Sequence, residues 1–256
     1  MITAATGVPA AVWLRTLIAV VVLSTVTVIL LRAYDVRAPW KQVTALARGA
    51  AQLVALSMIL SGVLTNGILV GAALAVMFSV AVVTATRRVG WSMPHLIATG
   101  TAMAAGAGTA LTTVFASGAL HLEGRYVLAA GGIVIGATMT VATLTSQHFT
   151  TDIATGWEEV EGWLSIGATA RQATARFARK AVRQALIPST DQTKTTGLVT
   201  LPGAFVGALF GGASPVEAGR FQIIVLASIM AAGALTAVVL VRQLSEVARR
   251  PVEETT

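Results

Sequence analysis

The sequence predicts an all-α, polytopic membrane protein with about seven transmembrane helices and one sizeable cytoplasmic helical loop. The first reason is composition, because 55% of the 256 residues are apolar and only 11% are charged, with a mean hydropathy of +0.78. The second is that uncharged runs long enough to cross a bilayer recur along the chain. The third is that Lys and Arg residues lie mainly at the ends of these runs, as in membrane proteins.

Composition also excludes several classes of protein. The net charge of +7 would suit a nucleic-acid partner, but no basic tract interleaved with aromatic residues is present, so none is expected. The chain has no cysteine, which excludes disulfides, thiolate metal sites and thiol catalysis. Neither H-E-x-x-H nor G-x-S-x-G occurs, and an intramembrane enzyme is not expected.

The uncharged runs divide into seven expected spans. Residues 12–31 form the first, and its uncharged part, residues 16–31, has one basic residue before it and three after it. This is the reverse of a secretory signal, so we expect a retained span. Residues 49–86 are too long for one helix and contain the turn sequence SGVLTNG, which predicts a hairpin of two spans. The remaining runs are residues 93–118, 126–150, 196–212 and 221–241. Residues 1–256 are thus predicted to be one transmembrane domain.

The distribution of Lys and Arg predicts the orientation of these spans, because basic residues are retained on the cytoplasmic side. With the N-terminus outside and the C-terminus in the cytoplasm, only Arg15, Arg125 and Arg220 of the 18 basic residues lie outside. The inner set comprises Arg32, Arg37, Lys41, Arg48, Arg87, Arg88, Arg171, Arg176, Arg179, Lys180, Arg183, Lys194, Arg242, Arg249 and Arg250. We therefore expect a multi-pass protein of the plasma or bacterial inner membrane, surrounded by the lipid bilayer.

In this orientation, residues 152–195 form the only sizeable cytoplasmic loop. The sequence EEVEGWLSIG predicts a short helix that ends at Gly167, and Thr169 with Gln172 has the spacing of a capping box that opens a second helix. That second helix is expected to run to Pro188. Its apolar and basic residues lie on different sides, which is typical of a helix at a membrane surface.

Two functions are open for this loop. One is a basic interfacial helix without a partner. The other is an elbow that inserts into a cytoplasmic motor subunit, because Glu161 and Gly167 have the spacing of the Glu and Gly in the coupling motif of ABC importer permeases. Glu161 would accept hydrogen bonds from basic residues of the motor, and Gly167 would permit the tight turn.

Two longer runs carry a resemblance to a known family. LSIGATARQA, residues 164–173, and ALIPSTDQTKTTGLVTLPG, residues 185–203, resemble the iron-export ABC-transporter permeases, the FetB-like family. The agreement continues to Gln222 and Ile223, and ARGAAQL places Arg48 and Gln52 on the family's R-x-x-x-Q-L. The resemblance implies a transporter membrane subunit and not an enzyme. It further implies that a second copy of the chain and two copies of a FetA-like ATP-binding subunit complete the exporter.

The chain lacks the G-x-x-x-x-G-K-[ST] loop that binds nucleotide. We therefore expect no cofactor in this chain and place ATP and Mg on the partner subunit. The resemblance implies a set of ATPase-coupling residues, which are Glu161, Leu164, Gly167, Ala168, Thr169 and Gln172. The candidate pathway or gating residues are Arg48, Gln52, Met139, Pro188, Asp191, Lys194, Pro202, Gly203 and Gln222.

The cargo is less closely defined than the class of protein. Ala137 stands where the family pattern has Asn, and Ser57 and Met58 stand where it has a Gly-Tyr pair. No Asp or Glu lies within the core of an expected span, so the sequence predicts no particular metal ligands. Iron or another metal ion is the expected cargo. The alternatives are an ABC permease for a non-metal small molecule, or an ATPase-independent secondary transporter or channel.

Several pathway candidates have a structural alternative. Asp191 and Lys194 are three residues apart and form either a gate or an ion pair that anchors a helix at the interface. Pro202 is expected inside the sixth span, where it would kink a pathway-lining helix. The glycines at 203, 207 and 211 offer the competing interpretation of close packing against another helix, such as one of a second copy.

Overall fold

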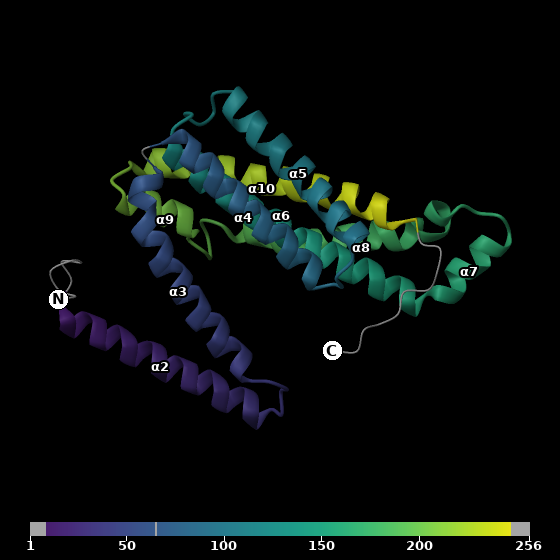
Figure 1. The fold of residues 1–256 in the computed structure, drawn as a ribbon, viewed down its shortest axis with the longest axis horizontal. Coiled ribbons are helices and arrows are strands. Elements are labelled where there is room, and N and C mark those ends of the chain that lie inside the picture. Colours follow the sequence, from purple (N-terminus) through teal and green to yellow (C-terminus); the bar gives the residue numbers. More distant parts are fainter. Residues whose placement is uncertain (1–8, 65, 247–256) are drawn as a thin grey trace. The chain divides into compact units, whose positions relative to one another are not determined.

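The computed structural model describes residues 9–64 and 66–246, and within these ranges it is built from long α-helices (Figure 1). Thr65 of the expected hairpin turn, and Arg249 and Arg250 of the expected inner set, lie outside the described residues. The chain divides into two compact units, Met1–Val63 and Leu64–Thr256. Each unit is described by itself.

The first unit is a pair of helices, α2 (Ala10–Ala33) and α3 (Trp40–Val63). The guanidinium of Arg32, at the end of α2, lies 5.0 Å from the centre of the Trp40 ring, a cation–π contact that joins the two helices at their connection. Large apolar side chains of α2 such as Leu17 and Leu23 are exposed. This exposure is what a helix surrounded by lipid requires.

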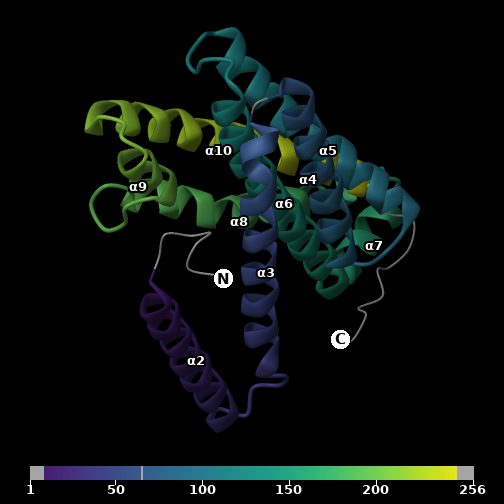
Figure 2. The same cartoon turned by 60° about the vertical axis from the view of Figure 1, so that its left-hand side comes forward.

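The second unit contains seven of the described helices. They are α4 (Gly67–Arg87), α5 (Met93–Ala116), α6 (Gly124–Thr155), α7 (Trp157–Ser165), α8 (Ala170–Thr195), α9 (Gly203–Phe210) and α10 (Pro215–Leu244). Helix α10 packs against α5, α6 and α8, and α4 packs against α6 (Figures 1 and 2). The bundle core therefore lies between α5, α6 and α10.

Small residues let these helices approach closely. A methyl group added at Gly106 of α5 would collide with the Thr236 hydroxyl and with the backbone carbonyl of Ala232 on α10. Ala102 and Met103 of α5 and Leu240 of α10 are completely buried in the bundle core. Close backbone approach at small residues is the usual way in which membrane helices associate.

Among the described residues, four helical segments are long and apolar enough to cross a membrane. They are Ala11–Ala33, Gly67–Arg87, Gly124–Thr155 and Pro215–Leu244. The multi-pass, all-helical class is therefore confirmed, whereas the count of seven spans is not. Helix α5 occupies the expected fourth span but is not among these four segments.

The expected sixth span, residues 196–212, is wrong as a continuous helix. Residues 196–202 form a turn, and only α9 is helical in this run. Gly197 has a φ of +85°, which ends the preceding helix. Pro202 is the N-cap of α9 and lacks a backbone N–H, so it precedes a helix and does not kink one.

The second helix of the loop also differs from its expected course. It does not end at Pro188 but continues through this residue to Thr195. Although Pro188 cannot donate a backbone hydrogen bond, its helix is held in place because Ala185 packs with Val141 of α6 and Ala237 of α10 in a buried cluster. The helix is therefore part of the bundle and does not lie separately on a membrane surface.

Candidate functional site

The elbow predicted from the sequence is present as α7, residues 166–169 and the first turns of α8, and we call this segment the elbow. Gly167 has a φ of +89°, a left-handed conformation that glycine adopts without strain. Its N–H donates to the Leu164 carbonyl at 3.0 Å, and the Ala168 N–H donates to the Trp163 carbonyl at 3.1 Å. These two bonds form a Schellman motif and end α7.

The next helix begins immediately after this turn. The Gln172 N–H donates to Thr169 Oγ1 at 3.3 Å, and the Thr169 N–H donates to Gln172 Oε1 at 2.9 Å. This reciprocal pair is the predicted capping box. A hydrogen-bonded helix end and a hydrogen-bonded helix start thus enclose the turn on both sides, which makes it rigid.

Two ion pairs join α8 to its neighbours, one to α7 within the elbow and one to α6. Arg176 of α8 bonds to Glu159 of α7 at 3.0 Å, and Lys180 of α8 bonds to Asp152 of α6 at 2.8 Å. The Asp152 side chain is only 16% exposed, so this pair is less screened by water than a surface pair. Helices α6, α7 and α8 are therefore held together at this end of α6.

An apolar cluster lies beneath the ion pairs. It is formed by Phe149 and Ile153 of α6, Val160 of α7, and Ala173 and Phe177 of α8, all of which are buried. The cluster also includes Val241 of α10. The elbow consequently packs as one body with the ends of two of the candidate membrane spans.

Gly156, between α6 and α7, is required by this packing. A Cβ added at Gly156 would lie 2.5 and 2.6 Å from two ring carbons of Phe177. The Phe177 ring therefore lies directly against the backbone at the junction of the two helices. The sequence did not single out this glycine, because the contact joins residues that are far apart along the chain.

The outer side of the elbow carries acidic and apolar groups. Glu161 is exposed, and Trp163 and Ile166 are 49% and 75% exposed although both are large and apolar. Leu164 is half-buried and packs against the apolar cluster of α6, α7 and α8. Exposed aromatic and aliphatic side chains beside a charge are typical of a surface that binds a partner protein.

Trp163 and Ile166 were missed by the sequence reasoning, which selected Leu164, Ala168, Thr169 and Gln172 around them. Periodicity alone gives no signal for Trp163, because it stands three residues after the buried Val160 and one before Leu164, a spacing that usually shares one helical face. Its exposure is decided by which helices pack against α7.

The predicted pathway residues are divided between the two units. Arg48 and Gln52 lie one turn apart on α3 in the first unit, and both are exposed. Met139 of α6 packs against the bundle core. Asp191 and Lys194 form an exposed ion pair of 3.4 Å near the end of α8, as their spacing predicts. Whether any of these residues acts as a gate stays a prediction.

The other candidates lie along α8, α9 and α10. Pro188 is exposed within α8, Pro202 precedes α9, and Gly203 is the first residue of α9. A Cβ added at Gly203 or Gly207 would meet no atom of the described residues within 4 Å. Within the described residues, these two glycines therefore do not serve close helix packing.

Gln222 of α10 is the pathway candidate with the most unusual environment. Its side chain is buried, and its Oε1 atom has no hydrogen-bond partner among the described residues. Three threonine hydroxyls are likewise buried without a hydrogen-bond partner among the described residues: Thr99 on α5, Thr145 on α6 and Thr236 on α10. Buried polar atoms without partners are rare because each one costs free energy.

The described residues contain no group of three or more His, Asp or Glu side chains that could hold a metal ion. His95 has a structural environment instead. Its two ring nitrogens lie 3.1 Å from the Gly90 carbonyl and 3.2 Å from Ser146 Oγ, and these contacts hold the start of α5 against α6. Backbone carbonyls, hydroxyls and amides, together with the Asp152 carboxylate near the end of α6, are thus the oxygen ligands that the buried part of the bundle offers.

Comparisons with known proteins place this geometry in context. Residues 14–247 match the profile of a family described as "Uncharacterised protein family (UPF0014)". The chain is 41% identical over 114 residues to "UPF0014 membrane protein STAR2" of Oryza sativa subsp. japonica, an alignment that covers 44% of this chain and 40% of the relative. It is 36% identical over 121 residues to "UPF0014 membrane protein YjkA" of Bacillus subtilis (strain 168), covering 47% of this chain and 48% of that one.

A third relative has a functional name. The chain is 33% identical over 138 residues to "Probable iron export permease protein FetB" of Escherichia coli (strain K12), which covers 54% of this chain and 53% of the relative. The chain thus spans about half the length of the curated relatives that it matches. No solved structure matches the chain.

Proposed function

The chain belongs to the UPF0014 family, and from this membership we propose that it is the membrane subunit of an ATP-binding-cassette exporter. The relative named as a probable iron export permease supports this class of function. The chain has no nucleotide-binding loop of its own, so ATP and Mg would bind to a separate FetA-like subunit. The exporter would contain two copies of each subunit.

The observation that carries the proposal is the rigid, outward-facing elbow. A turn enclosed by a Schellman motif and a capping box would keep its conformation when the ATP-binding subunit moves, because its backbone hydrogen bonds are satisfied within the elbow. Glu161 would pair with basic residues of the ATP-binding subunit. Trp163 and Ile166 would enter an apolar groove on that subunit.

The contacts behind the elbow supply a route for movement. A displacement of α7 would be passed to α8 through Glu159 and Arg176, and from α8 to α6 through Lys180 and Asp152. Helix α8 then packs through Ala185 into the cluster that it shares with α6 and α10. A contiguous set of packed helices of this kind is the physical requirement for coupling between two sites.

The orientation that agrees with this role has the elbow in the cytoplasm and the N-terminus outside. Helix α6 has 32 residues and is about 48 Å long, whereas the hydrocarbon core is about 30 Å thick. One end of α6 therefore extends beyond the core. Its last turns would form the extending end, because the apolar run of α6 begins at Tyr126, directly after its first turn's Arg125, whereas residues 147–152 are mostly polar and lead into the charged elbow.

The proposed cargo is iron or another metal ion. The unpaired Oε1 atom of Gln222 and the unpaired hydroxyls of Thr99, Thr145 and Thr236 are the buried acceptors that such a cargo would meet. Weak oxygen ligands suit a transported ion, which must leave as readily as it binds. A non-metal small molecule is the second candidate, since the described residues form no metal-binding cluster.

Co-purification of the chain with a FetA-like subunit from the same genome tests the proposal. We expect a stable complex whose ATPase activity depends on the membrane subunit, and a loss of both on replacing Glu161 and Trp163. The control is Glu123→Gln, because Glu123 is a half-exposed carboxylate at the opposite end of α6. A complex that forms equally well without the two elbow side chains would contradict the coupling surface.

A second measurement separates the cargo from the class of transporter. Cells with and without the gene are grown under iron overload, and their total metal content is compared. Higher cellular iron in the absence of the gene supports iron export. Unchanged content of iron and of every other measured metal favours the non-metal alternative and leaves the exporter architecture in place.

A further inference from the structure

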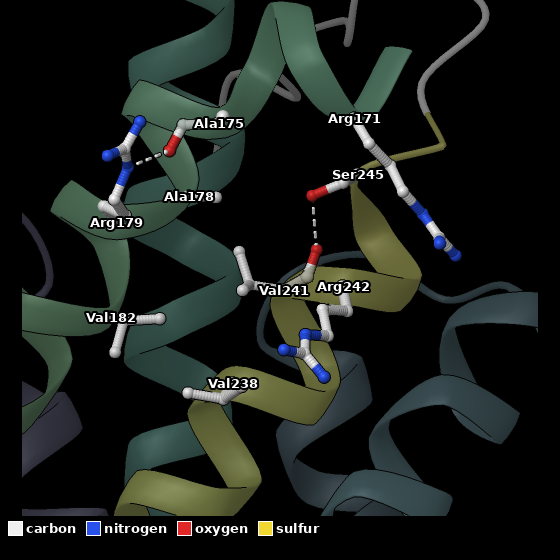
Figure 3. Close-up of a pocket in the computed structure, with 9 residues that line it drawn as sticks. All are labelled: Arg171, Ala175, Ala178, Arg179, Val182, Val238, Val241, Arg242 and Ser245. Carbon is white, nitrogen blue, oxygen red and sulfur yellow. Dashed lines mark hydrogen bonds between the residues drawn. The ribbon is translucent and has the colours of Figure 1, made fainter. Parts of the chain in front are cut away.

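A groove lies between α8 and α10 beside the elbow, with a volume of about 360 Å³ (Figure 3). Its floor is apolar and is formed by Ala175, Ala178, Val182, Val238 and Val241. Val182 and Val238 point toward each other from the two helices (Figure 3). The groove is therefore suited to a hydrocarbon chain rather than to a polar molecule.

Three arginines border this apolar floor. Arg242 extends from α10 toward Val238 (Figure 3) and makes no ion pair with any described residue. Arg179 donates through Nε to the Ala175 carbonyl at 3.1 Å, which leaves its two terminal nitrogens available. Arg171 pairs with Glu246 at 2.9 Å, and both side chains of this pair are largely exposed. The border thus carries an excess of positive charge.

The groove lies where a membrane span ends. It involves the last two turns of α10, which has 30 residues and a length of about 45 Å, more than the hydrocarbon thickness of about 30 Å. The facing turns of α8 contain Arg171, Arg176, Arg179, Lys180 and Arg183, which cannot lie in hydrocarbon. The groove is consequently at the level of the lipid headgroups.

We propose that this groove binds one anionic phospholipid. Guanidinium groups make charge-assisted hydrogen bonds to phosphate oxygens, so Arg242 and Arg179 would hold the headgroup. An acyl chain would lie over Val182 and Val238. The arginine border together with the apolar floor favours a lipid, because a free phosphate ion would contact only the arginines and not the floor.

A lipid in this position would join two helices that matter for transport. It would contact α8 within three turns of the elbow and α10 at the end of a candidate span. The lipid would fill a space that protein side chains leave open between these helices. Anionic lipid is therefore expected to stabilise their contact.

The test uses the full-length chain, purified in detergent and titrated with phosphatidylglycerol or phosphatidylcholine, with bound lipid measured by native mass spectrometry. We expect phosphatidylglycerol to bind at least about ten-fold more tightly, because both headgroups offer a phosphate but the positively charged choline of phosphatidylcholine is repelled by the arginine border. The double change Arg179→Gln with Arg242→Gln should remove this difference. Arg183→Gln is the matched control, because Arg183 is exposed on the same helix but does not line the groove.

A second variant distinguishes a lipid from a free phosphate without removing any charge. Ala178→Leu narrows the floor of the groove and should weaken phosphatidylglycerol binding by about ten-fold, as several methylene contacts are displaced. Inorganic phosphate should compete poorly with the lipid. Equal binding of the two lipids, an equal loss with Arg183→Gln, or full displacement by inorganic phosphate with Ala178→Leu unaffected would each overturn the proposal. If the double variant does not fold, the Ala178→Leu titration alone decides between these outcomes.

Discussion

Lys180 Nζ lies 2.8 Å from Asp152 Oδ1, and this ion pair joins α8 to α6 across 28 residues of sequence. Asp152 is one turn before Gly156, where α6 gives way to the elbow. Its other oxygen, Oδ2, is buried without a partner among the described residues. Among the ion pairs of the described residues, this pair has the least exposed carboxylate side chain.

Breaking this pair should loosen α8 without unfolding the chain. Asp152→Asn is expected to lower the free energy of unfolding by about 1 kcal/mol, because Lys180 is exposed enough to be hydrated when its partner is lost. A double-mutant cycle with Lys180→Met, followed by thermal unfolding in detergent, measures the interaction. A coupling energy of zero between the two changes would show that the contact does not stabilise the fold.

Gly156→Ala should destabilise the junction of α6 and α7. The added methyl would meet the Phe177 ring, and overpacking of this kind typically costs about 1–3 kcal/mol. Phe177→Leu in the same chain should recover part of the loss by making room. Gly162→Ala is the control, because a Cβ there meets no described atom within 4 Å; a similar loss in the control would contradict the steric explanation.

Gly167→Ala tests the turn itself. Open space surrounds Gly167 among the described residues, so the cost comes from the left-handed backbone alone, about 1–2 kcal/mol for a residue with a Cβ. Gly167→Asn should cost less, because asparagine tolerates this conformation. The proposed coupling predicts that ATPase stimulation falls in the same order, Ala below Asn below Gly. If neither variant changes the free energy of unfolding, a side chain does not strain the turn. If ATPase stimulation follows the reverse order, the proposed coupling through the turn is contradicted.

Trp163→Ala separates folding from partner binding. Because about half of the Trp163 residue is exposed, its removal should lower the free energy of unfolding by only about 1–2 kcal/mol, less than the loss of a fully buried tryptophan. An exposed tryptophan at the centre of an interface commonly contributes about 2 kcal/mol or more to binding. The Kd for the ATP-binding subunit should therefore rise by more than about ten-fold, and an unchanged Kd would remove Trp163 from the interface.

Gln222→Leu tests whether a buried polar atom is kept for transport. Replacing an unpaired buried amide by an apolar group of similar size should leave stability unchanged or raise it, because the desolvation cost of the amide disappears. If Gln222 meets the cargo, export should fall in the same variant. Loss of stability together with full export would instead assign Gln222 a structural role.

The elbow was predictable because its determinants are local. The left-handed position at Gly167 and the reciprocal bonds of Thr169 and Gln172 depend on residues within a few positions of each other. Such patterns are readable from a short stretch of chain. The same holds for the Asp191–Lys194 pair, whose partners lie one helical turn apart.

The course of the chain after the elbow was not predictable in this way. Residues 196–212 have the hydropathy of a span, but Gly197 and Pro202 separate them from α8 and leave only the short helix α9. Pro188 has the chemistry of a helix end, yet α8 passes through it because Ala185 is held between Val141 and Ala237. In both regions the sequence allowed more than one helix boundary, and the packing of the surrounding helices selected one of them.

The sequence by itself determined that this is a helical membrane protein and determined where the elbow turns, since hydropathy and capping act over short distances. The tertiary structure decided which helices enclose the elbow, why Gly156 must lack a side chain, and where an apolar groove acquires its arginine border. Those features join residues from α6, α8 and α10. They arise only when distant segments are packed together, because burial and close contact are properties of the folded bundle and not of any one segment.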